Sequence, residues 1–317
     1  MSDMSMLING LKVTAEKGAT FERRNPLDGS VATRAPAASP ADAVMAVEAA
    51  AEAFKTWGET GPGMRRALLL KAADALEAKT PKFIEAVAAE TGGTAMWAGF
   101  NCFLAAGMIR EAAALTTQIS GELIPSDIPG SLAMGVRQPA GVVLGIAPWN
   151  APVILGVRAI CVPLACGNTV ILKGSENCPR THQLIIESFE DAGFPPGVVN
   201  YITNAPADAG AVVEAMVAHP AVRRVNFTGS TKVGKIIAMT CAKYLKPVVL
   251  ELGGKAPMVV LDDADLDAAV LHAAQAHASQ QFTDQVGRKR KGIRGIHSGV
   301  WIKNQRFFII DHPGRHP

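Results

Sequence analysis

The chain has 317 residues, the length of about two domains, and 49% of them are hydrophobic, which is enough for a large core and excludes a disordered chain. The formal net charge is +3, but eight basic residues and one acidic residue lie in positions 286–317, so the rest of the chain is slightly acidic. A nucleic-acid-binding protein should carry basic residues across its folded body, so we expect no nucleic-acid partner.

The first third of the chain is predicted to be mostly helical. Up to about Arg34 the sequence is irregular, with a turn signal in NPLDGS. Ser39 is expected to cap a helix that begins at Pro40. Thr80 followed by proline repeats this cap signal, and the helices after the first are predicted over residues 64–78, 80–91 and about 95–117.

The middle of the chain alternates strands with helices. The continuous apolar run over residues 141–146 predicts a buried parallel strand, and further strands are predicted over residues 168–173, 198–202, 223–228, 248–252 and 258–263. Helical runs separate most of them, and Asp263 is expected to cap the last helix. This alternation predicts an α/β fold with a Rossmann-like, doubly wound parallel sheet after a helix-rich N-terminal region.

Doubly wound sheets bind ligands where their strands end, so these junctions are candidate sites. Gly229 and Ser230 lie between a strand and a helix, where backbone N–H groups suit a phosphate. The segment GSTKVGK also allows a P-loop, although Ile236 replaces the expected Ser or Thr, or an ordinary glycine-containing turn. Asn150 ends a Pro-Trp-Asn turn, where its amide either stabilises negative charge on a substrate oxygen or makes a local turn bond.

Two further junctions place charged side chains just past strand ends. Lys173 and Glu176 suit the hydroxyls of a ribose, or they form an exposed ion pair. Glu251 ends an apolar strand, and a partly desolvated carboxylate there is a candidate general base. The alternative for Glu251 is a structural ion pair with Lys255.

In combination these motifs are specific. APWN, KGSE, FTGSTKVG and LELGGKAP, in that order and at this spacing, resemble the NAD(P)-dependent aldehyde dehydrogenase superfamily. The resemblance covers about Gly10 to Ala278, and over residues 108–204 it is most similar to the branch that acts on aromatic aldehydes such as salicylaldehyde, benzaldehyde and vanillin. It implies an NAD-binding domain, the start of a catalytic domain, and a basic tail outside the family pattern, over residues 1–251, 252–278 and 279–317.

The resemblance also implies residue roles. Asn150 would donate to the oxyanion and Glu251 would be the general base. Arg158 and Trp97 would line the aldehyde pocket, with an ion pair and a core aromatic as the respective alternatives. Glu176 favours NAD over NADP, because a 2′-phosphate would face its carboxylate. The expected cofactor contacts are Ala147, Pro148, Trp149, Lys173, Ser175, Glu176, Gly229, Ser230, Val233, Gly234 and Leu252.

The nucleophilic cysteine of this family is missing from the expected place. It should follow Glu251 in a segment resembling NQGQxC, near Gln285, but the local sequence is QQFTDQVGRKR, and the last cysteine of the chain is Cys241. We expect a truncated or frameshifted gene product with an incomplete catalytic domain. The alternative is an NAD-binding fragment without dehydrogenase activity.

The remaining expectations concern the surroundings of the protein. The five cysteines form no CxxC pair, which argues against a disulfide scaffold and a zinc site, so no metal is expected. With no signal peptide and no apolar run long enough for a bilayer, the predicted location is the cytoplasm, without a membrane partner. The resemblance implies a homodimer or homotetramer in which residues 131–139 pair with a C-terminal strand.

Overall fold

A computed structural model describes residues 2–254, 258–261, 263–281, 301–302 and 305–309. The chain divides into two compact units, Met1–Glu251 and Leu252–Pro317, and each is described by itself. Most of the predicted basic tail and the position expected for the nucleophile lie outside the described residues. That the first unit binds the cofactor and the second begins the catalytic domain stays a prediction.

The first unit is built on a parallel-rich sheet of seven strands in the order β12-β11-β8-β9-β10-β2-β3. The four central strands β11, β8, β9 and β10 pair in parallel, and every residue of β8, β9 and β10 is buried, as their apolar runs predict. The predicted α/β sheet is thereby confirmed. The strand bounds are β2 (Met6–Ile8), β3 (Leu11–Val13), β8 (Val142–Ile146), β9 (Thr169–Lys173), β10 (Val199–Ile202), β11 (Val222–Gly229) and β12 (Val248–Leu252).

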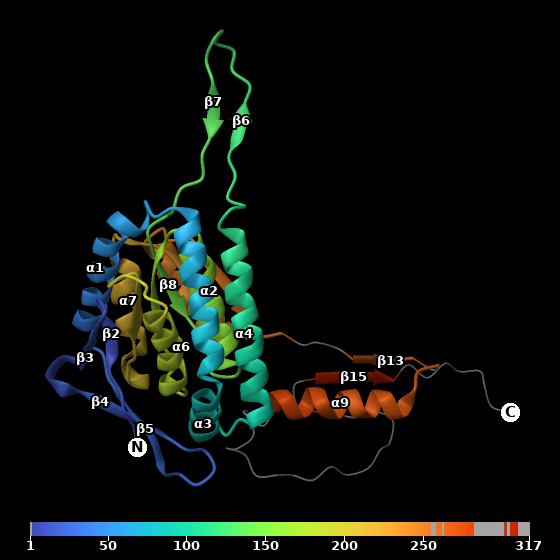
Figure 1. Cartoon of the computed structure of the whole chain (residues 1–317). Helices are drawn as coiled ribbons and strands as arrows, with labels where there is room; N and C mark the ends of the chain where they lie inside the picture. Colours follow the sequence, from blue (N-terminus) through green and yellow to red (C-terminus); the bar gives the residue numbers. More distant parts are fainter. Residues whose placement is uncertain (1, 255–257, 262, 282–300, 303–304, 310–317) are drawn as a thin grey trace. The chain divides into compact units, whose positions relative to one another are not determined.

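Helices pack around this sheet and against one another. Helix α1 packs against α7, and α2 packs against α4 and α6 (Figure 1). The helix-rich N-terminal region is confirmed. The bounds are α1 (Pro40–Trp57), α2 (Pro62–Ala78), α3 (Thr80–Thr91), α4 (Ala95–Leu115), α5 (Pro152–Ala165), α6 (Pro179–Asp191), α7 (Ala209–Ala218) and α8 (Thr231–Lys243), with short 3₁₀ turns at Glu16–Gly18 and Pro206–Asp208.

The N-terminal segment, predicted to be irregular, forms strands instead. β1 (Ser2–Asp3), β4 (Thr20–Arg24) and β5 (Val31–Pro36) make a separate three-stranded sheet, while β2 and β3 extend the edge of the main sheet. The expectation was wrong because these strands are fixed by pairing rather than by a local apolar pattern: β4 pairs with β5, and Leu7 of β2 pairs with Tyr201 of β10. The turn expected in NPLDGS is confirmed, since it joins β4 to β5.

Two of the three predicted helix caps differ in the structure. Ser39 does cap α1, in a reciprocal pair with Asp42: the Asp42 N–H donates to the Ser39 hydroxyl, and the Ser39 N–H to the Asp42 carboxylate. Thr80 caps nothing, because its hydroxyl donates to the carbonyl of Glu77 at 2.7 Å. Asp263 is also wrong, because Asp265 is the residue that accepts from the first turn of α9 (Leu266–Gln281).

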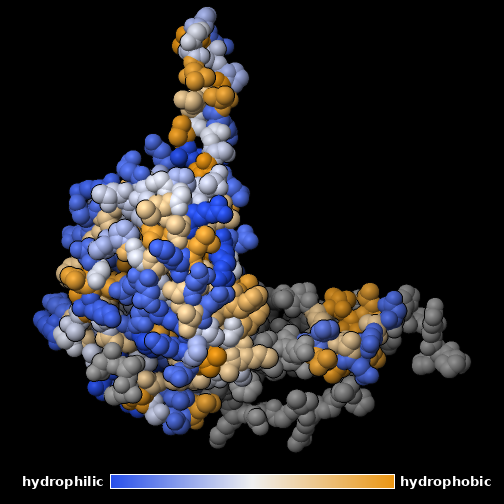
Figure 2. Space-filling view, viewed as in Figure 1, coloured by the Kyte–Doolittle hydropathy of each residue, from blue (hydrophilic) through white to orange (hydrophobic). Residues whose placement is uncertain are grey.

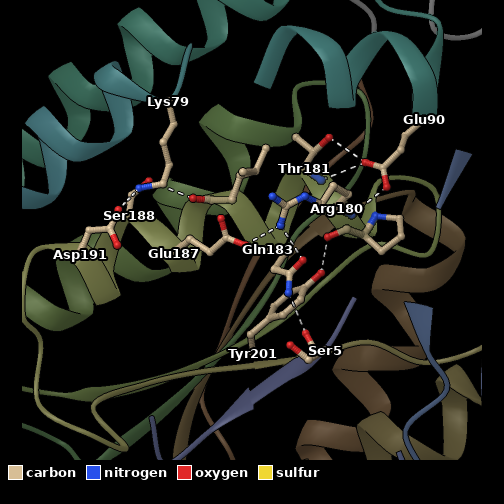
Figure 3. Close-up of polar contacts among 12 residues, drawn as sticks. Ser5, Lys79, Glu90, Arg180, Thr181, Gln183, Glu187, Ser188, Asp191 and Tyr201 are labelled. Carbon is tan, nitrogen blue, oxygen red and sulfur yellow. Dashed lines mark hydrogen bonds and ion pairs between the residues drawn. The ribbon is translucent and has the colours of Figure 1, made fainter. Parts of the chain in front are cut away.

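The carboxylate of Glu90 fixes the beginning of α6 (Figure 3). Glu90 is fully buried and accepts from the backbone N–H groups of Arg180 and Thr181, at 2.7 and 2.9 Å. The hydroxyls of Thr181 and Thr33 donate to it as well, at 2.8 and 2.9 Å. Burial raises the pKa of Glu90, and these hydrogen bonds act in the opposite direction. A distant acid thus supplies the cap that α6 lacks locally.

A hairpin of β6 (Glu122–Ile124) and β7 (Ala133–Gly135) forms a sheet of its own and extends from the body of the first unit (Figure 1). Apolar residues are exposed along it (Figure 2), namely Leu123, Ile124, Ile128, Leu132, Met134 and Val136. This exposure fits a surface that another chain covers.

The second unit contains α9 and a small sheet of three strands in the order β13-β15-β14. The bounds are β13 (Met258–Val260), β14 (Trp301–Ile302) and β15 (Gln305–Ile309). The predicted strand over residues 258–263 therefore exists in part but does not join the main sheet. Among the described helices, none is long and apolar enough to cross a membrane.

Candidate active site

The turn after β8 carries Asn150. Ala147 is buried, Pro148 and Trp149 are half-buried, and Asn150 is exposed. The indole N–H of Trp97, at the start of α4, donates to the backbone carbonyl of Asn150 at 3.1 Å. This bond holds the backbone of the turn at Asn150. Trp97 is half-buried and stacks on Phe100, so it lies at the edge of this turn and is not a core aromatic.

The turn after β9 joins Lys173 to Glu176. The Lys173 ammonium contacts Oε1 of Glu176 at 2.5 Å, with side-chain exposures of 7% and 22%, so the pair is largely buried and is not the exposed ion pair considered as its alternative. A Cβ at Gly174 would lie 2.6 Å from the hydroxyl of Tyr201, so the turn needs glycine at this position. Burial would by itself raise the pKa of Glu176, but the charge of Lys173 and hydrogen bonds outweigh it and lower that pKa.

The end of β12 brings Glu251 to Arg158 of α5. The Arg158 guanidinium donates to Oε2 of Glu251 at 2.8 Å and to the hydroxyl of Thr228 at 3.2 Å. The side chain of Glu251 is 56% exposed, so the partly desolvated carboxylate expected from the sequence is not what the structure shows. Lys255, the alternative partner, lies outside the described residues. Arg158 therefore forms the ion pair that was considered as its alternative, and its place in an aldehyde pocket stays a prediction.

The junction of β11 and α8 is a single residue. Ser230 caps α8 by accepting from the N–H of Val233 at 3.3 Å, and Gly234 is buried in the first turn. A Cβ at Gly229 would lie 2.5 Å from the ring of Phe227, so glycine allows the strand to end there. The P-loop alternative is wrong, because residues 231–235 are already helical and leave no loop to surround phosphates.

The predicted residues meet in three pairs: Trp97 with Asn150, Lys173 with Glu176, and Arg158 with Glu251. In the described part of the chain, no hydrogen bond links one pair to another. Leu252, the last residue of β12, is half-buried and is the first residue of the second unit.

Two residues that the sequence did not single out organise the turn after β9. His182 is fully buried, accepts from the Ser175 N–H at Nδ1 and donates from Nε2 to the Pro152 carbonyl, at 3.0 and 3.1 Å. Burial lowers the pKa of His182 to about 4, so the ring is neutral and joins the turns after β8 and β9. Asn204 donates to Glu176 at 3.0 Å. The position of His182 on α6 gave no indication of this role, whereas Asn204 lies two residues past the end of β10.

None of the cysteines has the properties of a nucleophile. All five are free, and four are buried. Burial raises the pKa of Cys161 to about 12 and that of Cys178 well above its usual value. A nucleophilic thiolate requires the opposite shift.

Comparisons with known proteins find similarity over most of the chain. The sequence profile of the aldehyde dehydrogenase family matches residues 13–281. A vanillin dehydrogenase from Pseudomonas sp. (strain HR199 / DSM 7063) is 63% identical over 270 residues, which is 85% of this chain and 56% of that protein. A salicylaldehyde dehydrogenase from Pseudomonas sp. (strain C18) is 51% identical over 84% of this chain and 55% of that protein.

Solved structures give the same result. The crystal structure of a salicylaldehyde dehydrogenase from Pseudomonas putida G7, complexed with salicylaldehyde, superposes with a TM-score of 0.84 at 49% identity and covers 86% of this chain and 56% of that one. An NAD-dependent benzaldehyde dehydrogenase from Corynebacterium glutamicum has a TM-score of 0.81 at 35% identity over 86% of this chain and 60% of that one. The chain thus spans little more than half the length of these relatives.

Proposed function

This chain belongs to the aldehyde dehydrogenase family, and we propose that its function is the oxidation of an aromatic aldehyde to its carboxylic acid with NAD⁺. The observation that carries the proposal is the buried Lys173–Glu176 pair at the end of β9, in a chain whose similar relatives include vanillin and salicylaldehyde dehydrogenases. Proteins of known structure similar to this one include an NADP-dependent and an NAD-dependent enzyme, so the choice of NAD rests on the chain's own residues.

The residues at the strand ends fit a dinucleotide. Glu176 would accept from the ribose hydroxyls and Lys173 would donate to them, while the N-terminus of α8 at Ser230 would face the pyrophosphate. Bound NAD⁺ would supply the hydride acceptor. The remaining cofactor contacts proposed from the family pattern are Ala147, Pro148, Trp149, Ser175, Gly229, Val233, Gly234 and Leu252.

Replacing Glu176 by Gln is expected to weaken NAD⁺ binding about tenfold, because an ionised acceptor of the ribose hydroxyls is lost. NADP⁺ binding should weaken less or improve, because the same change removes the charge that faces a 2′-phosphate. Titration calorimetry of both cofactors with the 317-residue chain measures this. An unchanged ratio of the two dissociation constants would contradict the role of Glu176.

The reacting groups proposed for this chain are Asn150 and Glu251. The exposed Asn150 amide would donate to the substrate oxygen as negative charge develops on it. Glu251 would take a proton from the hydrolytic water at Oε1, because its Oε2 accepts from Arg158. The Arg158 pair therefore holds the base in place between turnovers.

Trp97 and Arg158 are proposed to border the aldehyde pocket, because they lie beside Asn150 and Glu251 respectively. A form of the enzyme that carries the family nucleophile should prefer salicylaldehyde and benzaldehyde to short aliphatic aldehydes by more than about tenfold in kcat/KM, because a planar ring can stack on the indole. A kinetic panel followed by NADH absorbance tests this, and a preference for aliphatic aldehydes would reject it.

The second candidate function is an NAD-binding protein without dehydrogenase activity, which the lack of a cysteine beyond Cys241 favours. Resequencing the gene across the codons for residues 278–287 distinguishes the two. A segment resembling NQGQxC in another reading frame would support the dehydrogenase. We also propose a cytoplasmic location and a homodimer or homotetramer built through the hairpin segment 131–139, whose exposed Leu132 and Met134 fit a covered surface.

A further inference from the structure

A buried amide holds the carboxylate of Glu176. Asn204 follows β10 and is fully buried. Its Nδ2 donates to Oε1 of Glu176 at 3.0 Å and to the carbonyl of Ala205 at 2.9 Å. The Lys173 ammonium reaches the same Oε1 at 2.5 Å. Two donors, one at the end of β9 and one past the end of β10, therefore converge on Oε1. In the described part of the chain, no other residue donates a hydrogen bond to Oε2.

The orientation of this amide has a cost. Oδ1 of Asn204 is buried without a hydrogen-bond partner among the described residues. An unpaired buried acceptor costs about 1–3 kcal/mol, and such atoms are rare in native structures. Reversing the amide would not help, because Glu176 Oε1 and the Ala205 carbonyl both require a donor. The observed orientation of the amide thus keeps the hydrogen bond to Glu176 and leaves Oδ1 of Asn204 without a partner among the described residues.

We propose that Asn204 is a positioning residue that sets cofactor choice: together with Lys173 it occupies Oε1 of Glu176 and leaves Oε2 to accept from a free ribose 2′-hydroxyl. This inference rests on the proposed cofactor site. A ligand with that hydroxyl gains a hydrogen bond to a fixed carboxylate oxygen. A 2′-phosphate is repelled by the negative charge of Glu176, because the carboxylate is held in place and cannot rotate away from it.

The electrostatics agree with this geometry. The hydrogen bond from Asn204 is one of the contributions that lower the pKa of Glu176, after the charge of Lys173 has offset burial. The other titratable groups near the carboxylate are Cys178, Tyr201 and His182. Burial raises the pKa of the first two and lowers that of His182 to about 4. All three are therefore neutral from about pH 5 to pH 8, and Glu176 is the group whose titration Asn204 changes.

The test is Asn204→Ala in the 317-residue chain, with calorimetric titration of NAD⁺ and NADP⁺. NAD⁺ binding is expected to weaken about three- to tenfold at neutral pH while NADP⁺ binding changes less than about twofold. Asn204→Asp, of the same shape, should give the larger loss and serves if the alanine variant does not fold.

Asn200→Ala is the matched control. Asn200 is a fully buried asparagine of β10, the strand that precedes Asn204, and its contacts are with Asn9, Gly197 and Val170, so its loss should lower stability without changing the NAD⁺/NADP⁺ ratio. An Asn204 variant that weakens both cofactors equally, or neither, overturns the inference. If the Asn204 variant overturns the inference but Glu176→Gln changes the NAD⁺/NADP⁺ ratio in the same assay, the proposed cofactor site still stands. If Glu176→Gln leaves the ratio unchanged, or NAD⁺ does not bind, both fail.

Discussion

The 317-residue chain is expected to form no NADH from salicylaldehyde or benzaldehyde above about a thousandth of the rate of a relative with the family cysteine. Hydride leaves an aldehyde readily only after a thiolate has added to its carbonyl carbon. Asn150 and Glu251 can stabilise an oxyanion and accept a proton from water, but neither forms that covalent adduct. The last cysteine, Cys241, is buried, and burial raises its pKa.

The test is to express residues 1–317 and follow NADH absorbance with both aldehydes. Cys161, Cys166 and Cys178 are the cysteines on and beside α5 and α6, and all three have a raised pKa because of burial. Turnover that survives their simultaneous replacement by Ala would contradict the requirement for a thiolate. Turnover lost with one of them would instead show that a displaced cysteine has taken the role.

The sequence predicted the parallel sheet well because its central strands are buried on both faces. β8, β9 and β10 are rich in apolar residues and buried along their whole length, and such segments are recognisable one at a time. The N-terminal strands were missed because β1, β2 and β3 have only two or three residues each, and because β2 is fixed by a partner far along the chain, as Leu7 is by Tyr201. Their existence depends on tertiary pairing, which a local pattern does not encode.

The candidate site was predicted as far as it lies at strand ends. Asn150, Lys173, Glu176 and Glu251 could be found because each follows an apolar run. The residues that contact these side chains were harder to predict from the sequence. The contact between Arg158 and Glu251 crosses 93 positions and needed coordinates. His182 and Asn204 act through buried hydrogen bonds to the turn after β9, and their types alone fit ordinary core residues.

Replacement of Glu90 by Ala is expected to destabilise the first unit by about 3–5 kcal/mol. The change leaves two buried backbone donors at the start of α6, from Arg180 and Thr181, without an acceptor, and it opens a cavity where the carboxylate was. Glu90→Gln keeps one acceptor oxygen and should cost about 1–2 kcal/mol. Glu85 lies exposed on the same helix α3, so Glu85→Ala is the matched control and should change stability by less than about 0.5 kcal/mol.

Urea unfolding followed by circular dichroism measures these differences as shifts in midpoint at constant slope. The Glu90→Ala change is also expected to affect the proposed cofactor site, because α6 carries His182, which accepts from the N–H of Ser175 beside Glu176. A start of α6 that frays should therefore weaken NAD⁺ binding in Glu90→Ala even at temperatures where the chain is still folded. Equal stability of Glu90→Ala and Glu85→Ala would show that the backbone donors of Arg180 and Thr181 find other acceptors. In that case the link from α3 through α6 to the turn after β9 would not exist.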